Sequence, residues 1–407
     1  MNAKELFTDK ENKYIYLERY VNDGSPSGFT EIHTTSNRTN PFLGEERFPL
    51  LEFQDSDIEC TSFGEHELFK RDVNYAHPDS IDSEILKSAG RQLKESSLIV
   101  SPASSGRTML LRNSQYSGYL KLTYDVGRLG RVDRQLAYNN CLSSYEITNQ
   151  IKKAIIENKL PPFFAILLES ASKITKLSVS NNTYEWGVIF REAIAYPYSN
   201  NNVVLIPGFS LFGKDRKNPN DEFLINQFIE LSNIPPRDYL IDLLKMIVEC
   251  HWKLVLNCAL IHECQAQNCL FELNEDFQIE RVVIIDMDSV DKDIPTAKYL
   301  GLDINWDSPY GMLNKDNYRY STRASTMYDW KLGEYVLSPL IKVVALKYGL
   351  DILSIENEIK SFVKNNFINN LPADYFPLDG NWYSHAPNER KPGEKRKFIA
   401  HKNPKFR

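Results

Sequence analysis

The longest apolar stretch of the sequence, residues 239–261, constrains the fold more than any other segment. It carries Asp242, Lys245, Glu249, His251 and Lys253. A membrane-spanning helix needs about 20 residues with few or no charges, so the stretch instead predicts a buried helix of a soluble protein, over residues 238–260. The 407 residues, 42% of them hydrophobic, are enough to bury a sizeable core around this helix in two or three domains or lobes.

Charge and cysteine usage exclude several classes of protein. The net charge of −6 argues against a general nucleic-acid binder. Only residues 390–407 are rich in Lys and Arg, either as a solvated tail or as a segment that faces phosphate or substrate. The six cysteines follow no zinc-binding spacing, and several lie in apolar runs, so we expect free thiols in the reducing cytoplasm. The first 16 residues lack the apolar core of a secretory signal, and no membrane partner is expected.

The predicted elements run from hairpins to helices. Strand pairs are expected within residues 109–124, 186–206 and 270–286, and a further strand at 98–100. Helices are expected at residues 82–95, 144–158, 164–173 and 238–260, and over most of the chain from about residue 321. This order predicts an α+β protein with lobes rather than a doubly wound parallel sheet.

The densest group of hydrogen-bonding side chains follows the long helix. Glu263, Gln265, Gln267 and Asn268 lie in a turn, and two strands later Asp286 follows four β-formers. Oxygen ligands from Glu263, Asn268 and Asp286 suit magnesium, a hard cation that neutralises phosphate charge. Any one of these residues alone fits a surface position at a helix end, but the combination with a strand-end aspartate predicts a metal–nucleotide site.

A second group, the turn of residues 104–108, follows the strand at 98–100. Its backbone N–H groups and hydroxyls can surround phosphate oxygens, and Arg107 can pair with a phosphate through two hydrogen bonds. Lys121, on the following hairpin, can reach the same phosphates as a point charge. The alternative is a solvated turn with a surface lysine.

A third group contains Arg128, Arg131 and Arg134, three arginines within seven residues. They form either an anion pocket for a carboxylate substrate or an exposed basic turn. Both interpretations stay open at this point.

Together these groups resemble the siderophore synthetases that work independently of nonribosomal peptide synthetases, the aerobactin-synthetase-like family. That family shows, in order, His-Pro, Ser-x-Arg-Thr, Lys-Leu, a Thr-Ser…Arg segment, Arg-Glu, Glu-Ala-His-x-Gln-Asn and a strand-end Asp. The counterparts here are His77-Pro78, Ser105-Gly106-Arg107-Thr108, Lys121-Leu122, Arg134, Arg191-Glu192, the segment from Glu263 to Asn268, and Asp286. The order and rough spacing carry the resemblance, which covers about residues 75–300.

The resemblance implies a hand-like fold. Residues 1–75 would be a shortened thumb, 76–200 the fingers, and 201–407 a kinase-like palm with a mostly helical C-terminal part. ATP and Mg²⁺ would bind between fingers and palm. ATP contacts would come from Ser105, Arg107, Thr108, Lys121, Gln265, Gln267 and Asn268, and metal ligands from Glu263, Asn268 and Asp286. A carboxylic acid, in that family often citrate or a derivative, would be adenylated and then condensed with an amine or hydroxyl.

Three departures separate this chain from the family pattern. The chain is shorter than the usual ~600 residues, with the loss expected in the thumb. Gln265 replaces the family's histidine. Leu129-Gly130-Arg131 replaces the Thr-Ser pair that helps to hold the acid, which counts against citrate and makes Arg131 the expected replacement ligand.

In the implied mechanism, a substrate carboxylate attacks the α-phosphorus of ATP and pyrophosphate leaves. Arg107 and Lys121 would offset phosphate charge, and Arg131, Arg134 and Arg191 would bind the acid. His77 would orient the substrate or accept a proton from the amine, its alternative being a structural role. This mechanism requires Arg107 and Asp286 to share one site.

Two alternatives remain. His262…Asn268 followed by Asp286 also resembles the catalytic and metal loops of small-molecule phosphotransferases, although no N-terminal Gly-rich loop is visible. The altered family positions favour a non-catalytic nucleotide-binding relative instead. The sequence identifies neither the acid nor the nucleophile, and a homodimer is the default expectation for a soluble enzyme.

Overall fold

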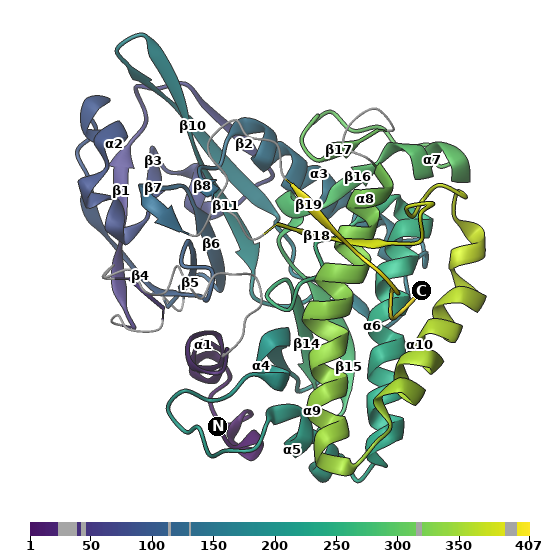
Figure 1. Cartoon of the computed structure of the whole chain (residues 1–407). Coiled ribbons are helices and arrows are strands. Elements are labelled where there is room, and N and C mark those ends of the chain that lie inside the picture. Colours follow the sequence, from purple (N-terminus) through teal and green to yellow (C-terminus); the bar gives the residue numbers. More distant parts are fainter. Residues whose placement is uncertain (23–38, 42–45, 113–114, 130–131, 315–319, 387–396) are drawn as a thin grey trace.

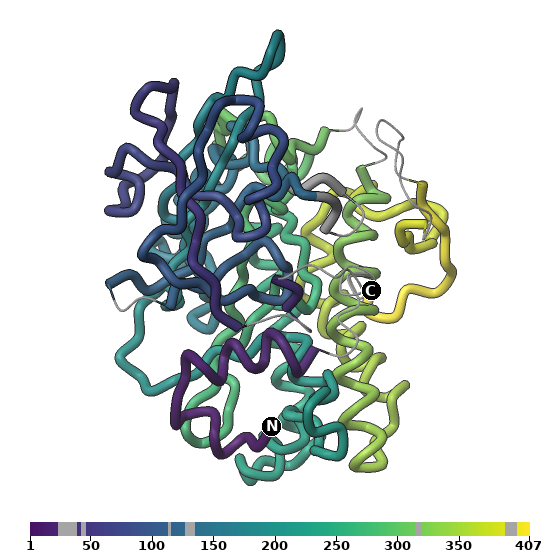
Figure 2. Tube along the Cα trace, turned by 90° about the vertical axis from the view of Figure 1, so that its left-hand side faces the viewer, coloured from purple at the N-terminus to yellow at the C-terminus, as the bar shows by residue number. Residues whose placement is uncertain are grey.

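The computed structural model describes residues 1–22, 39–41, 46–112, 115–129, 132–314, 320–386 and 397–407. Figure 1 shows a strand-rich lobe, built mostly from the first half of the chain, beside a lobe in which helices dominate. Helix α1 (Lys10–Tyr20) lies at the lower end in Figures 1 and 2, where it contacts strand β12 (Val204–Pro207) of the second lobe. The predicted α+β class is confirmed.

The large sheet of the first lobe has eight strands, and all its neighbours pair antiparallel. In spatial order they are β2 (Cys60–Phe63), β10 (Ala171–Val179), β11 (Asn182–Glu192), β6 (Gly118–Leu122), β5 (Thr108–Leu111), β4 (Lys94–Pro102), β1 (Phe48–Gln54) and β3 (Val73–Ala76). Strands from before and after residue 75 share this sheet. The domain boundary expected at that residue stays a prediction.

Short elements surround the large sheet. They are η3 (Glu67–Lys70), η4 (Pro78–Asp82), α2 (Glu84–Ser88) and the hairpin of β7 (Tyr124–Leu129) and β8 (Val132–Arg134). The N-terminal η1 (Ala3–Glu5) instead contacts α5 (Leu224–Ser232) of the helical lobe. The predicted helix at residues 82–95 is thus confined to α2, since the chain is already extended in β4 from Lys94.

The second sheet is buried on both faces and joins the lobes. Its order is β12, β14 (Cys269–Leu273), β15 (Ile279–Ile284) and β9 (Phe164–Ile166), with only β9 parallel to its neighbour. Side chains alternate across it, as the two-residue period of a strand requires. Leu270 and Val283 pack with Leu110 and Tyr119 of the large sheet, whereas Phe271 belongs to the core of the helical lobe.

The long helix predicted at residues 238–260 is confirmed as α6 (Pro236–Cys258). Asp242, Lys245, Glu249 and Lys253 lie on its less buried side at spacings of three and four residues, so the opposite side packs into the core. None of the described helices is long and apolar enough to cross a membrane.

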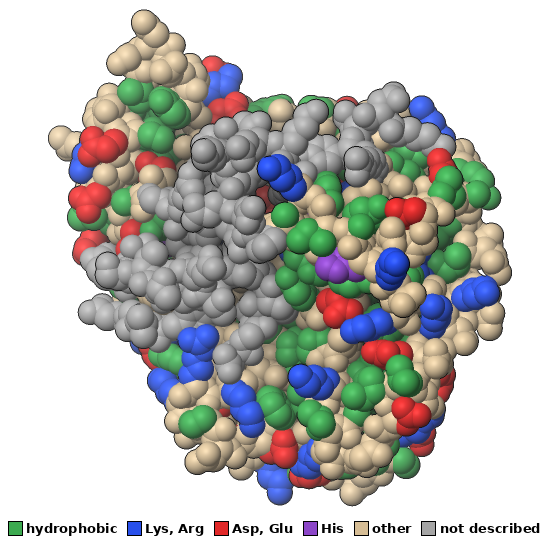
Figure 3. Space-filling model, in the orientation of Figure 1, with side chains coloured by type: hydrophobic (Ala, Val, Ile, Leu, Met, Phe, Trp, Pro, Cys, Tyr) green, Lys and Arg blue, Asp and Glu red, His purple; other side chains and the backbone are tan. Residues whose placement is uncertain are grey.

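The remaining elements complete the helical lobe. They are α3 (Tyr138–Ile156), α4 (Gly208–Phe212), α5 (Leu224–Ser232), β13 (Leu260–Ile261), η5 (Met287–Ser289), β16 (Asp291–Asp293), α7 (Ile294–Leu300), β17 (Met312–Leu313), α8 (Tyr320–Ser325), the π-helical η6 (Thr326–Leu337), α9 (Ser338–Tyr348), α10 (Ile352–Asn366), η7 (Ile368–Asn370), β18 (Trp382–His385) and β19 (Phe398–His401). Figure 3 shows basic and acidic side chains interspersed on the surface of the region where Figure 1 places α9 and α10.

Two sequence predictions of elements are wrong. Residues 164–173 form β9 and the start of β10 instead of a helix, because a short apolar run has no period that separates a buried strand from a buried helix. The strands expected to pair within residues 186–206 lie in different sheets: β11 pairs with β10 and β6, and β12 pairs with β14. The predicted pairs within 109–124 and 270–286 are confirmed.

Candidate active site

Two aspartates beyond the end of β15 face the large sheet. The chain turns at Asp286, whose φ of 72° lies in the left-handed region that aspartate tolerates better than most residues. Lys121 of β6 lies between the two carboxylates and donates hydrogen bonds to Oδ1 of both Asp286 and Asp288. Arg107 Nη2 lies 3.9 Å from Asp288 Oδ2, and Arg191 Nη2 lies 3.3 Å from Asp286 Oδ1. We call these five residues the aspartate cluster.

The two aspartates of the cluster differ in their electrostatics. Burial opposes ionisation of Asp286, but Lys121 and Arg191 outweigh it and hold the pKa of this carboxyl far below its usual range. Burial raises the pKa of Asp288, and the nearby charge of Asp286 adds to the effect. The Asp286 side chain is 23% exposed and that of Lys121 only 2%, so a ligand from solvent would meet Asp286 first.

A second carboxylate fixes Arg191 from behind. Glu169 Oε1 accepts hydrogen bonds from Arg191 Nε at 3.0 Å and from Nη2 at 2.6 Å, and the Ser144 hydroxyl donates to Glu169 as well. The pKa of Arg191 is raised, because the charge of Glu169 outweighs burial. Sequence reasoning missed Glu169 because it follows the apolar run that was predicted as a helix.

The turn of residues 104–108 is held in shape from within and by His77. Gly106 has a φ of 75°, which glycine adopts without strain, and Ser105 Oγ accepts from the Thr108 N–H at 3.2 Å. His77 is fully buried; its Nδ1 accepts from the Asp79 N–H at 3.1 Å, so Nε2 carries the proton and donates to Gly106 O at 2.9 Å. These contacts favour the structural role among those considered for His77.

Three segments distant in sequence meet at Ser104. Gln267 Nε2 donates to Ser104 Oγ at 3.0 Å, and the Ser104 N–H donates to Glu18 Oε2 at 2.9 Å. The Tyr14 hydroxyl donates to the other Glu18 oxygen at 2.9 Å, and burial raises the pKa of Glu18. The sequence analysis assigned the first 75 residues to a shortened thumb, and nothing local in the sequence marks Glu18 as part of the site.

Glu263 and Gln265 share a lysine from the helical part of the chain. Lys331 Nζ lies 3.0 Å from Glu263 Oε1 and donates to Gln265 Oε1 at 3.3 Å. Burial opposes ionisation of Glu263, but Lys331 and Arg323 lower its pKa below the usual value. Asn268 Nδ2 donates to the Glu263 carbonyl at 3.1 Å, which closes the turn. Neither basic residue was predicted from the sequence.

The aspartate cluster brings together four of the predicted site residues, Arg107, Lys121, Arg191 and Asp286. Glu263 and Gln265 instead contact Lys331. Asp286 and Asp288 offer the oxygen donors that Mg²⁺ prefers, and Arg107 and Lys121 beside them suit phosphate, so the chemistry of this donor set fits a magnesium–nucleotide complex. Arg131 lies outside the described residues, as does the side chain of Arg134, so the predicted acid pocket stays a prediction.

Comparison with solved structures identifies proteins with a similar fold. The petrobactin biosynthesis protein AsbB from Bacillus anthracis superposes with a TM-score of 0.73 at 14% identity over 97% of this chain and 75% of that one. The chain has the fold of a siderophore synthetase. The ATP-bound aerobactin synthetase IucA from Klebsiella pneumoniae gives a TM-score of 0.67 at 11% identity, over 94% of this chain and 76% of the other. IucC from the same species gives 0.61 at 14%, over 90% and 71%.

The resemblance predicted from the ordered motifs is therefore confirmed at the level of the fold. No protein-family model and no curated protein matches the chain. The likeness to these structures is one of fold, at identities of 10–14%.

Proposed function

We propose that this chain is an ATP-dependent synthetase that adenylates a carboxylic acid and condenses it with an amine or hydroxyl, in the biosynthesis of a siderophore or related metabolite. One observation carries the proposal. Lys121 of the large sheet lies between Asp286 and Asp288 of the second sheet, with Arg107 and Arg191 beside it, in a chain whose fold matches an ATP-bound synthetase. The proposal includes the hand-like arrangement, with a kinase-like palm around Asp286.

ATP would bind between the turn of residues 104–108 and the loop of residues 265–268. Gln267 donates a hydrogen bond to Ser104, which supports the pairing of the two segments. Ser105, Thr108, Gln265 and Asn268 would add contacts to the nucleotide. Arg107 and Lys121 would bind the phosphates, because both lie where phosphate charge can replace the carboxylates that now pair with them.

Asp286, with Glu263 or Asn268, would hold magnesium, which when bound neutralises charge on the phosphates. Asp288 also belongs to this set, since it shares Lys121 with Asp286. The charge of the buried Arg191 helps to keep Asp286 ionised. The main effect of Arg191 on the reaction would therefore be to position that carboxylate.

The substrate carboxylate would attack the α-phosphorus of ATP, forming an acyl–phosphate bond and releasing pyrophosphate. The amine or hydroxyl would then attack the acyl carbon and release AMP. Much of the rate gain would come from holding the carboxylate beside the α-phosphate, for which Arg131 and Arg134 are the proposed ligands.

The test is pyrophosphate release in a screen of di- and tricarboxylic acids, with and without polyamines. Arg107→Ala should lower acid-dependent release by about 100-fold, since it removes one donor to the developing charge. Arg91→Ala, which removes a surface pair with Asp57, is the matched control and should retain full activity.

The products separate the alternatives. AMP and pyrophosphate support the synthetase, and ADP would instead identify a phosphotransferase. Binding of Mg–ATP without turnover across the whole panel of acids and amines would favour a non-catalytic relative.

A further inference from the structure

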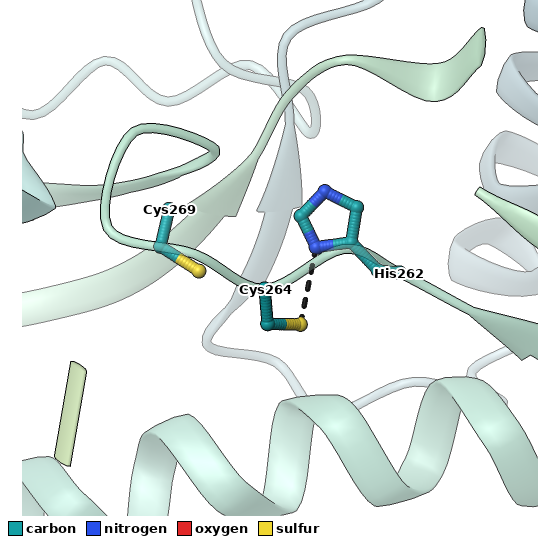
Figure 4. A group of neighbouring side chains, drawn as sticks. All are labelled: His262, Cys264 and Cys269. Atoms are coloured by element: carbon teal, nitrogen blue, oxygen red, sulfur yellow. Dashed lines mark hydrogen bonds between the residues drawn. The ribbon is translucent and has the colours of Figure 1, made fainter. Parts of the chain in front are cut away.

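A buried group of one imidazole and two thiols flanks the loop of residues 265–268. One donor atom each from His262, Cys264 and Cys269 can be chosen so that all three lie within 4.8 Å of one another, and all three residues are buried. Figure 4 shows the His262 ring and the Cys269 sulfur on either side of Cys264. The cysteine spacing alone gave no zinc pattern in the sequence, because one donor is a histidine and because the turn of residues 265–268 is what brings Cys269 back beside His262 and Cys264.

Hydrogen bonding leaves one lone pair of His262 facing the thiols. His262 Nε2 lies 2.8 Å from the Ile285 carbonyl, which can only accept, so this nitrogen carries the ring proton. Nδ1 is then unprotonated, and it lies 3.1 Å from Cys264 Sγ. A metal-binding histidine is typically oriented in this way, with its second nitrogen donating to a backbone carbonyl.

Further donors line the same space. A cavity of about 10 Å³ is bounded by the three residues together with Cys250 and His251 of α6, and by apolar side chains. His251 Nδ1 lies 3.4 Å from Cys264 Sγ, and its Nε2 is buried without a hydrogen-bond partner among the described residues. The cavity is thus lined by three thiols and two imidazoles, and among the described residues only the donor atoms of His262, Cys264 and Cys269 all lie within 4.8 Å of one another.

The separations suit a tetrahedral ion. With metal–ligand bonds of about 2.0–2.3 Å, tetrahedral zinc holds its donor atoms about 3.5 Å apart. The distances of 3.1 and 3.4 Å from Cys264 Sγ to the two imidazole nitrogens lie close to that value. Sulfur and imidazole donors select zinc or copper(I) and disfavour magnesium and calcium.

Charge decides between zinc and copper(I). Binding removes one proton from each of Cys264 and Cys269, and a divalent ion balances the two thiolates. A monovalent ion would leave a net negative charge in an apolar pocket, which is unfavourable without a compensating partner.

We propose that His262, Cys264 and Cys269 bind a structural Zn²⁺ ion, with the neutral imidazole of His251 as the fourth ligand. The ion would fix both ends of the loop of residues 265–268, because Cys264 and Cys269 flank it. It would also fix the end of β15, because His262 binds the carbonyl of Ile285, next to Asp286. The site itself does not depend on the proposed reaction.

The experiment uses the full chain, purified with a reductant and freed of metal by a chelator. Co²⁺ is titrated as the probe, and the sulfur-to-cobalt charge-transfer absorption is followed. We expect saturation at one equivalent, displacement of Co²⁺ by Zn²⁺, and a rise in melting temperature of about 3–5 °C when Zn²⁺ is at 100 times its dissociation constant.

Single variants test the ligand set. Cys264→Ala and Cys269→Ala should each weaken binding at least tenfold and reduce the charge-transfer intensity. Cys258→Ala, in a buried cysteine of α6 that lies outside the group, should bind as the unmodified chain does. His251→Ala should weaken binding more than Cys250→Ala does, because a third thiolate would leave a net negative charge in the pocket. Near-ultraviolet circular dichroism confirms that each variant is folded.

Several outcomes would overturn the proposal. One is the absence of stoichiometric Co²⁺ and Zn²⁺ binding by the reduced chain. Another is equal affinity in the Cys264→Ala, Cys269→Ala double variant. Binding of copper(I) in competition with a chelator, without any Zn²⁺ binding, would contradict the charge argument. Pyrophosphate release is measured separately, so loss of the metal site and failure of the synthetase proposal are distinguishable.

Discussion

Lys121 shows how one residue can link the two lobes. It lies on the large sheet, is almost fully buried, and pairs with two aspartates that follow the second sheet. Removing one residue from a buried group of charges lowers the stability of the protein by more than the whole group contributes to it, because the remaining charges stay unpaired in a medium of low dielectric constant. The aspartate cluster is therefore a site where stability and the proposed phosphate chemistry depend on the same charges.

Lys121→Met should lower the free energy of unfolding by about 3 kcal/mol, because Asp286 and Asp288 lose their shared cation. Adding Asp288→Asn removes one of the two repelling carboxylates and should restore at least about 1 kcal/mol. Urea unfolding of the single and double variants measures both values. Lys176→Met removes an exposed pair with Glu59 and should leave stability nearly unchanged. Additive effects of Lys121→Met and Asp288→Asn would contradict the coupling.

Asp293 should make stability depend on pH. It is fully buried, and burial raises its pKa from 3.8 to about 6, although the Thr296 N–H and Tyr320 hydroxyl donate to it. The folded state holds this proton more tightly than the unfolded chain, so its stabilising effect is complete below about pH 4 and is lost as pH rises through about 6.

Asp293→Asn keeps an oxygen acceptor for the Thr296 N–H and has no charge to bury. The free energy of unfolding of the variant, relative to the unmodified chain, should therefore rise by about 2–3 kcal/mol between pH 4 and pH 7. Denaturant titrations across this range give the difference. Parallel pH profiles for the two proteins would show that Asp293 is ionised in the folded state.

At the scale of elements, the loop of residues 265–268 packs closely against the start of helix α4. Gly208, the first residue of α4, packs against it: a Cβ at this position would lie 2.6 Å from the Cys269 carbonyl oxygen and 2.8 Å from that of Ala266. Both contacts are to backbone, which cannot rotate away as a side chain can. The helix start therefore requires glycine in order to approach the loop that is proposed to bind ATP.

Gly208→Ala should destabilise the chain by about 2 kcal/mol through overpacking, and should weaken Mg–ATP binding by displacing the loop. Gly301→Ala is the control. Its backbone is left-handed and a Cβ there would meet no atom within 4 Å, so it should cost roughly 1–2 kcal/mol without affecting the nucleotide. Thermal unfolding and isothermal calorimetry provide the two readouts. Unchanged ATP affinity in Gly208→Ala would separate this loop from the nucleotide site.

For the whole molecule, the contacts between lobes decide whether a ligand stabilises both. Leu270 and Val283 pack against the large sheet, and the Gln267–Ser104 bond and the aspartate cluster cross the same boundary. A nucleotide bound there would contact both lobes at once. Ligand binding to the folded state alone then raises the stability of the complete unit.

Mg–ATP at 100 times its dissociation constant should stabilise the chain by about 2.7 kcal/mol in a single unfolding transition. The increase in melting temperature should be lost in Arg107→Ala and retained in Arg91→Ala. Differential scanning calorimetry measures the shift. An equal shift in Arg107→Ala would place the nucleotide away from the aspartate cluster.

The sequence by itself determined the mixed α+β class, the helix α6, the β14–β15 pair and the ordered motifs that predicted the synthetase fold. These features are local: their hydrophobic periods and residue order are legible within a window of the chain. Only the tertiary structure decided that β11 and β12 lie in different sheets, that residues 164–166 form a strand, and that Glu18, Glu169 and Lys331 reach the site. The physical reason is that strand pairing and buried ion pairs depend on partners far apart in sequence, which no local pattern specifies.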